Sequence, residues 1–184
     1  MITLDPYLSE VFPQPPLVAH KRQKNIRDFV IKAKVPKPNL TKPKRILNGM
    51  KRCTKMCPIC PYIKETKQMR DKNFTWKLNT KITCKSYNIV YMIICKKENC
   101  RLKYIGESER TLKDRICEHI TYIKTRNRTQ ATGEHFNLPG HSLHDMEVMA
   151  LEIVQSKDPL YRKERESYLI RKFNTFHQGI NKMP

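Results

Sequence analysis

The sequence predicts a mixed α/β fold of the α+β type, a small three-stranded antiparallel sheet flanked by helices, which follows a cysteine-rich extension. Two observations support this prediction. Short apolar segments rich in β-branched and aromatic residues, typical of buried strands, occur at 88–95, 102–108 and 147–154. The segments 110–124 and 158–173 instead repeat apolar residues at helical spacing. From residue 88 onward the chain therefore has the pattern of one compact domain.

The first two strands are "NIVYMIIC" (88–95) and "LKYIGES" (102–108). Only a short stretch separates them, so we expect a hairpin whose loop region carries Cys95 and Cys100. The segment "EVMALEIV" (147–154) is the third predicted strand.

Two helices have clear start signals. In the first, Leu112, Ile116, Ile120 and Ile123 recur at steps of four and three, and Thr111 with Asp114 resembles a capping box. The second begins with an aspartate suited to the N-cap position, Asp158, followed by Pro159 at the first helical position. We therefore expect both helices to begin at these residues.

Composition divides the chain into three parts. Residues 1–48 are rich in proline and lysine and predict an extended basic linker, with a short helix or docked segment at 25–35. Residues 49–86 form a cysteine-rich module, and 87–184 form the compact domain.

The charge indicates the class of partner. Lysine and arginine number 37 against 17 acidic residues, which gives a net charge of +20 and an isoelectric point near 9.8. A polyanion is the expected partner. No apolar run approaches the roughly 20 residues of a membrane-spanning helix, and the N-terminus lacks the pattern of a secretory signal. We therefore expect no membrane partner, no secretion, cysteines present as thiolates, and a nuclear protein, cytoplasmic before import.

Two groups of residues have the chemistry of zinc ligands. Cys53, Cys57 and Cys60 have C-x3-C-x2-C spacing, and Cys84 is the expected fourth ligand. A second set combines two cysteines with two histidines, with His144 as a further candidate; its members are Cys95, Cys100, His135 and His141. The alternative for both groups is that small buried cysteines pack as hydrophobic residues. The sequence thus predicts a zinc-binding extension and a second zinc site.

Three side chains on the helices are candidates for catalysis. Arg115 and His119 lie four residues apart and share a helix face, where they can bind a phosphate and move a proton. Composition alone favours a solvated basic face. Glu166 lies on the apolar side of its helix, where a carboxylate requires a cation or a metal. A buried ion pair with Arg162 or Arg115 is the alternative for Glu166.

These residues occur in the order of motifs in a known family. Tyr91 in "NIVY", "YIG" at 104–106, the Arg115/His119 helix, Glu166 and Asn181 resemble GIY-YIG nucleases. The chain is most similar to the endonuclease domain that follows the reverse transcriptase in Penelope-like retroelements, where cysteines lie between the first two motifs. "EHFNLPGH" and the final "GIN" share this resemblance, and "IVY" replaces "GIY". No reverse transcriptase is present, so the chain is either a fragment or a separated descendant.

The resemblance implies a role for each residue. Glu166 binds one Mg²⁺ or Mn²⁺ ion, Arg115 neutralises the phosphate, and either Tyr91 or Tyr104 helps to activate water. His119 assists proton transfer or holds a tyrosine. In addition, Gly106 permits a close backbone approach and Asn181 fixes the wall of the site.

The resemblance also implies a function. We expect a metal-dependent DNA endonuclease that nicks target DNA for retroelement insertion, with retroelement RNA or the reverse transcriptase of the same polyprotein as further partners. A catalytically inactive, zinc-stabilised nucleic-acid-binding module is the first alternative, and an interaction protein with redox-active cysteines is the second.

Overall fold

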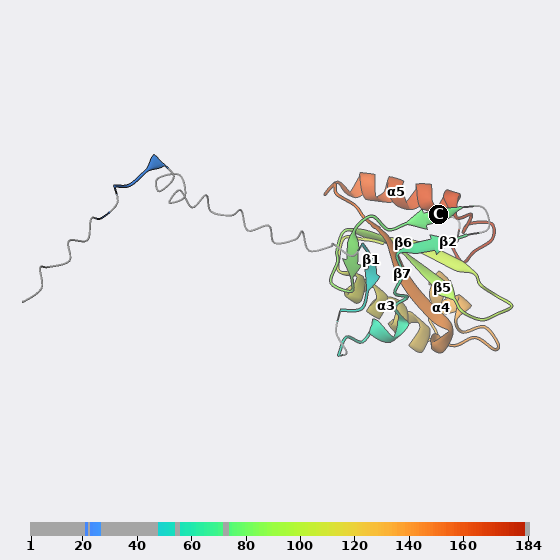
Figure 1. Ribbon diagram of the computed structural model, residues 1–184. Helices are drawn as coiled ribbons and strands as arrows, with labels where there is room; N and C mark the ends of the chain where they lie inside the picture. Colours follow the sequence, from blue (N-terminus) through green and yellow to red (C-terminus); the bar gives the residue numbers. More distant parts are fainter. Residues whose placement is uncertain (1–20, 22, 27–47, 54–55, 72–73, 183–184) are drawn as a thin grey trace, which may run out of the picture. The chain divides into compact units, whose positions relative to one another are not determined.

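The computed structural model divides the chain into two units, Met1–Lys44 and Arg45–Pro184, and Figure 1 shows the described residues in colour. The residues it describes are 21, 23–26, 48–53, 56–71 and 74–182. The linker predicted at 1–48 and the short helix predicted at 25–35 lie almost entirely outside the described residues.

A three-stranded antiparallel sheet forms the centre of the second unit. Strand β5 (Ile89–Cys95) lies between β6 (Lys103–Ser108) and β7 (Met146–Ile153), and it pairs antiparallel with both. Every residue of β5 is buried, as expected for the middle strand of a sheet covered on both faces. The predicted mixed α/β fold with its small antiparallel sheet is confirmed.

The register of the hairpin sets which side chains share a face. Tyr91 is paired with Gly106, and Ile93 with Tyr104. Because side chains alternate along a strand, Tyr91, Tyr104 and Gly106 share one face of the sheet, and Glu107 projects from the other.

Three helices accompany the sheet. Helix α3 (Leu112–Lys124) begins after Thr111, whose side chain accepts a hydrogen bond from the Asp114 backbone N–H. Helix α5 (Pro159–Lys172) begins after Asp158, whose carboxylate accepts one from the Leu160 N–H. Both predicted starts are confirmed. The short helix α4 (Ala131–His135) lies near α3, whereas α5 covers the opposite face of the sheet (Figure 1).

Residues 49–86 contain four short strands that sequence analysis did not predict. Strand β1 (Gly49–Lys51) pairs in parallel with β4 (Lys81–Thr83), and β2 (Gln68–Arg70) pairs antiparallel with β3 (Thr75–Lys77). A 3-10 turn, η1 (Cys60–Tyr62), lies between β1 and β2. Three-residue strands carry too little periodicity to be recognised in a sequence.

This cysteine-rich segment shares its core with the sheet. Two of its side chains bind residues of β7. The indole N–H of Trp76 donates to the Leu151 carbonyl at 3.0 Å, and Lys64 forms an ion pair with Glu147 at 2.7 Å. The ring of Phe173, at the end of α5, packs against Trp76. The segment therefore packs against β7 and the end of α5. The predicted domain boundary at 86/87 stays a prediction.

A buried arginine fixes α5 to the sheet. Arg162 is 5% exposed; its Nε donates to Glu107 on β6, and its Nη1 donates to Asn88 Oδ1 at 2.7 Å. Asn88 in turn donates to the backbone carbonyls of Val154 and Ser156. Because Glu166 follows Arg162 by one helical turn, this network also sets the position of Glu166.

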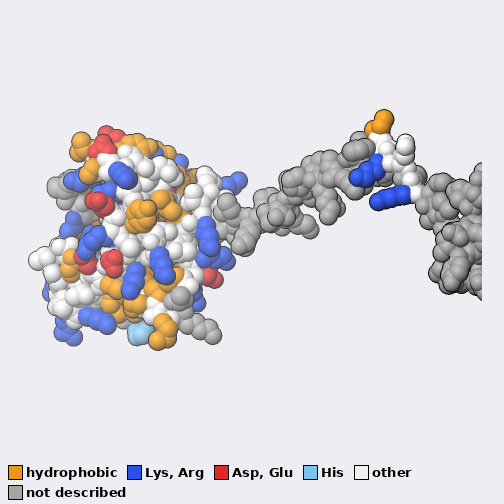
Figure 2. All heavy atoms as spheres, turned by 90° about the vertical axis from the view of Figure 1, so that its left-hand side faces the viewer, with side chains coloured by type: hydrophobic (Ala, Val, Ile, Leu, Met, Phe, Trp, Pro, Cys, Tyr) orange, Lys and Arg blue, Asp and Glu red, His pale blue; other side chains and the backbone are white. Residues whose placement is uncertain are grey.

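The surface of the unit is rich in cations. Figure 2 shows lysine and arginine side chains spread over one face, with acidic and hydrophobic side chains between them. Within the described part of the chain, no helix is long and apolar enough to cross a membrane.

Replacing the buried arginine tests its structural role. Arg162→Ala leaves Asn88 and Glu107 without their partner, so we expect a loss of about 3 kcal/mol in the free energy of unfolding. Urea denaturation followed by circular dichroism measures it. Arg165→Ala is the control, because its ion pair with Glu152 is more exposed and should contribute about 1 kcal/mol or less. Equal losses in the two variants would contradict this account.

Candidate active site

Two candidate catalytic side chains contact the Tyr91 hydroxyl. It accepts a hydrogen bond from Arg115 Nε at 3.0 Å and lies 2.7 Å from His119 Nε2. Tyr91 comes from β5, whereas Arg115 and His119 lie one turn apart on α3. The sequence predicted that the arginine and the histidine share a face, and the structure brings both to one oxygen atom.

The environment keeps Tyr91 protonated and His119 neutral. Tyr91 is 0% exposed, and burial together with the nearby Tyr104 raises its pKa well above the ordinary value. Burial and the charge of Arg115 lower the pKa of His119 to about 3. Since Arg115 supplies a donor to the Tyr91 oxygen, the Tyr91 proton is available to donate to His119 Nε2.

Two residues that sequence analysis missed hold this cluster. Thr132, 1% exposed at the start of α4, lies with its Oγ1 2.7 Å from His119 Nδ1. Glu118 accepts a hydrogen bond from Arg115 Nη1 at 2.7 Å. The i,i+3 spacing of Glu118 and Arg115 was a usable signal. Thr132 gave none, because tertiary structure alone brings it to His119.

Gly106 leaves room for the two tyrosines. A Cβ at this position would lie 2.6 Å from the Tyr91 hydroxyl and 2.9 Å from Cε1 of Tyr104. Any larger residue would displace the Tyr91 ring, which packs directly over the strand. The close approach predicted for Gly106 is thus made by a side chain.

Glu166 is a half-buried carboxylate on α5. Burial and the neighbouring Glu107 raise its pKa to about 7, and its charge helps to raise the pKa of Tyr104. Among the described residues, no lysine or arginine forms an ion pair with Glu166. The alternative of a buried pair is therefore wrong for both predicted partners, since Arg162 pairs with Glu107 and Arg115 with Glu118. A partly desolvated carboxylate without a cation fits a divalent metal ligand.

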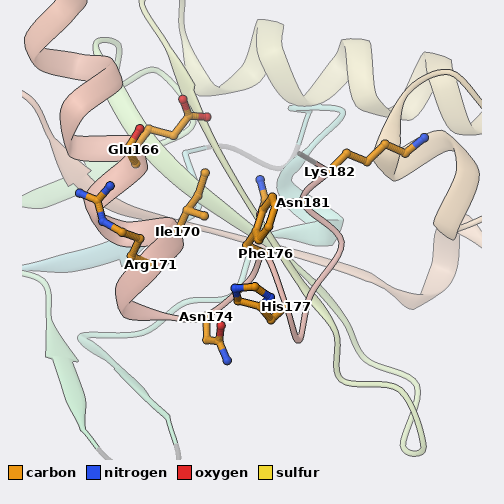
Figure 3. A pocket seen from close by; sticks show the side chains of 9 residues that line it. Glu166, Ile170, Arg171, Asn174, Phe176, His177, Asn181 and Lys182 are labelled. Carbon is orange, nitrogen blue, oxygen red and sulfur yellow. The ribbon is translucent and has the colours of Figure 1, made fainter. Parts of the chain in front are cut away.

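Asn181 closes the site from the C-terminal segment. Its side chain accepts from the Ile105 N–H at 2.9 Å and donates to the Ile105 carbonyl at 2.7 Å, as a neighbouring strand would. It lines two cavities, one beside Glu166 (Figure 3) and one beside Tyr104 and His119. Asn181 thus borders both the cavity beside the carboxylate and the cavity beside the tyrosine–histidine cluster.

The four predicted ligands of the first zinc site come together. The sulfurs of Cys53, Cys57, Cys60 and Cys84 lie within 4.8 Å of one another. Cys60 Sγ is 3.7 Å from Cys53 Sγ and 3.6 Å from Cys84 Sγ. Tetrahedral zinc with ordinary Zn–S bonds separates its sulfurs by roughly 3.8 Å. This group therefore fits a zinc ion.

The second predicted set also comes together. Ligand atoms of Cys95, Cys100, His135 and His141 lie within 4.8 Å of one another, and Cys100 Sγ is 3.6 Å from His135 Nε2. In the described structure His141 Nε2 is buried without a hydrogen-bond partner, as expected of an atom that binds metal. Burial and His141 lower the pKa of His135, which favours the neutral ligand form. His144 is exposed and lies outside this group.

Comparison with known proteins identifies the family. The model of the GIY-YIG catalytic domain matches residues 87–181, more than half of the chain. The protein therefore belongs to the GIY-YIG family, whose members are nucleases that act on DNA and typically use divalent metals. No curated protein and no solved structure matches the chain significantly.

The raised pKa of Glu166 predicts a pH-dependent gain in stability for one variant. Its folded-state value of about 7 exceeds the ordinary 4.5, so ionisation costs stability as pH rises between these values. Without added divalent cation, Glu166→Gln should raise the melting temperature at pH 8, and the gain should shrink toward pH 5. The exposed Glu164 on the same helix is the control, as Glu164→Gln. A gain for Glu166→Gln that is equal at both pH values would show that ionisation is not its cause.

Proposed function

We propose that this protein is a metal-dependent DNA endonuclease that nicks its target by phosphodiester hydrolysis. The observation that supports this proposal best is the state of Glu166. It is half-buried, has a raised pKa and no ion-pair partner in the described structure, and it interacts electrostatically with Tyr104 and Arg115. A half-buried carboxylate beside an arginine and a tyrosine suits the binding of a metal and a phosphate.

Arg115 is suited to hold the phosphate. The hydrogen bonds to Tyr91 and Glu118 fix its guanidinium, so little conformational freedom is lost when an anion binds. A planar guanidinium that is already oriented stabilises the charge that develops on phosphate oxygens during hydrolysis.

Tyr104 is the better candidate for the tyrosine that acts on water. The Tyr91 hydroxyl is fully buried and engaged by both Arg115 and His119. Tyr104 is only partly buried and lines the cavity beside His119. We therefore assign Tyr91 and His119 to holding Arg115 in position, and Tyr104 to the proton of the attacking water.

Glu166 would hold the divalent cation, Mg²⁺ or Mn²⁺. Bound there, the cation would supply positive charge that stabilises the phosphate and would offset the effect of Glu166 on the pKa of Tyr104. Gly106 and Asn181 keep the tyrosines and the wall of the site in position.

Zinc is proposed for the two cysteine-containing groups in a structural role. Neither group includes Tyr104, Arg115 or Glu166, and thiolate and imidazole ligands suit zinc whereas the carboxylate suits Mg²⁺. The two metals therefore do not compete for one site.

The biological setting is proposed from the sequence resemblance to Penelope-like elements. The nick would open target DNA for insertion, in the nucleus, with retroelement RNA or the reverse transcriptase portion of the same polyprotein as partners. The positive surface supports binding to nucleic-acid backbones without regard to sequence (Figure 2).

A plasmid-nicking assay tests the proposed activity. With Mg²⁺, the wild-type protein should convert supercoiled plasmid to open circles, and Glu166→Ala should abolish this. Tyr104→Phe should lower the rate by about 10²- to 10⁴-fold, because it removes the group that exchanges a proton with water. Glu164→Ala, an exposed change on the same helix, should retain activity. If wild type and Glu166→Ala bind DNA equally and are both inert, the protein is a binding module.

Metal analysis tests the zinc sites. Purified wild-type protein should contain two zinc ions per chain, one for each group. Cys84→Ser should lose one of them, whereas Cys117→Ser should keep both because Cys117 belongs to neither group. Protein that is folded and free of zinc would leave packing or redox chemistry as the role of the cysteines.

A further inference from the structure

Two cavities with part of their lining in common lie beside the candidate catalytic residues. The larger, about 600 Å³, is lined by Glu166, and the smaller, about 220 Å³, by Tyr104 and His119. Asn181 and Lys182 line both. A phosphate placed between Glu166 and Tyr104 would therefore lie beside the residues common to both cavities, and most of the larger cavity would remain open beside it.

The wall of the larger cavity combines apolar and cationic groups. Ile170 and Phe176 contribute its apolar side chains, and Figure 3 shows the Phe176 ring next to Asn181. Arg171 follows Ile170 on α5, is exposed, and forms no ion pair within the described part of the chain. Lys182 is less available, because it pairs with Glu134 at 2.6 Å. The Phe176 ring, with the His177 ring against it at 5.0 Å between centroids, and the Arg171 guanidinium thus belong to the same cavity as the catalytic carboxylate.

We propose that the 600 Å³ cavity binds a single unpaired nucleotide of the cleaved DNA strand, next to the phosphate that is cut. This inference rests on the proposed function. The volume lies within the range of about 300–1,000 Å³ typical of small-molecule sites. The Phe176 ring stacks on the base, and Arg171 contacts the phosphate beyond it.

The geometry implies a preference for DNA that is unpaired near the cut. A base inside a duplex is stacked between its neighbours and cannot reach a ring set in a cavity wall. The nucleotide must therefore be extruded, or be unpaired already at a nick, flap or single-stranded stretch. Stacking does not distinguish strongly among the bases, so the site recognises an unpaired base without reading its identity.

Binding of short oligonucleotides tests the stacking contact. The full chain is titrated, without added divalent cation, into fluorescent (dT)8 and into an abasic strand of the same length. Wild type should bind (dT)8 more tightly. Phe176→Leu should weaken (dT)8 binding by roughly 5- to 150-fold and leave the abasic strand unchanged. Phe176→Tyr keeps an aromatic ring and should retain the preference.

The phosphate contact is tested by its salt dependence. Arg171→Ala should weaken both strands alike and reduce the slope of log K against log[salt] by about 0.7, the effect of one lost contact to a single strand. Lys81→Ala is the matched control, because Lys81 is exposed on β4 and lines neither cavity. It should leave the slope and the preference for (dT)8 unchanged.

The outcomes separate this inference from the proposed nuclease activity. If Phe176→Leu, folded by circular dichroism, binds both strands like wild type, or if wild type binds neither, the nucleotide site is refuted whether or not plasmid is nicked. If Phe176→Leu does not fold, two other outcomes refute the nucleotide site. These are wild-type protein that shows no preference for (dT)8, and an Arg171→Ala variant that leaves the slope of log K against log[salt] unchanged. A base-dependent loss in protein that never nicks plasmid supports the nucleotide site and refutes the endonuclease.

Discussion

The hydrogen bonds at the Tyr91 hydroxyl join the centre of the sheet to the helix that carries the catalytic candidates. Arg115 and His119 reach this oxygen from α3, and Thr132 and Glu118 hold them from the far side. Because Tyr91 and His119 are buried, the loss of one partner would leave a polar group unsatisfied in the core. The hydrogen bonds that orient Arg115 therefore also stabilise the fold.

A second set of interactions places Glu166 against this cluster from the other face of the sheet. Arg162 ties α5 to Glu107 and Asn88, and the apolar end of α5 packs at Phe173 against Trp76 of the cysteine-rich segment. The segment 49–86 thus supports the helix that carries the carboxylate. In our proposal zinc stabilises this segment and the hairpin loop and takes no part in the hydrolysis.

The site contains two tyrosines and two glutamates whose different surroundings give the members of each pair different roles. Two tyrosines lie on the same face of the hairpin, yet one is sealed and doubly hydrogen-bonded whereas the other borders a cavity. Two glutamates lie near each other, yet Glu107 is neutralised by Arg162 and Glu166 has no ion-pair partner in the described structure. Each pair leaves one member free for substrate or metal, which is the pattern expected of acid–base sites.

Local patterns in the sequence determined the strands at 88–95 and 102–108, the starts of α3 and α5, and the common face of Arg115 and His119. These features depend on side-chain periodicity and capping, which act over a few residues. The spacing of Cys53, Cys57 and Cys60 likewise predicted that these three ligands come together. Tertiary structure alone decided that Thr132 meets His119, that Arg162 pairs with Glu107 instead of Glu166, and that Tyr91 is sealed while Tyr104 borders a cavity. These outcomes depend on which segments distant in the chain pack together and exclude water, and no local pattern records that.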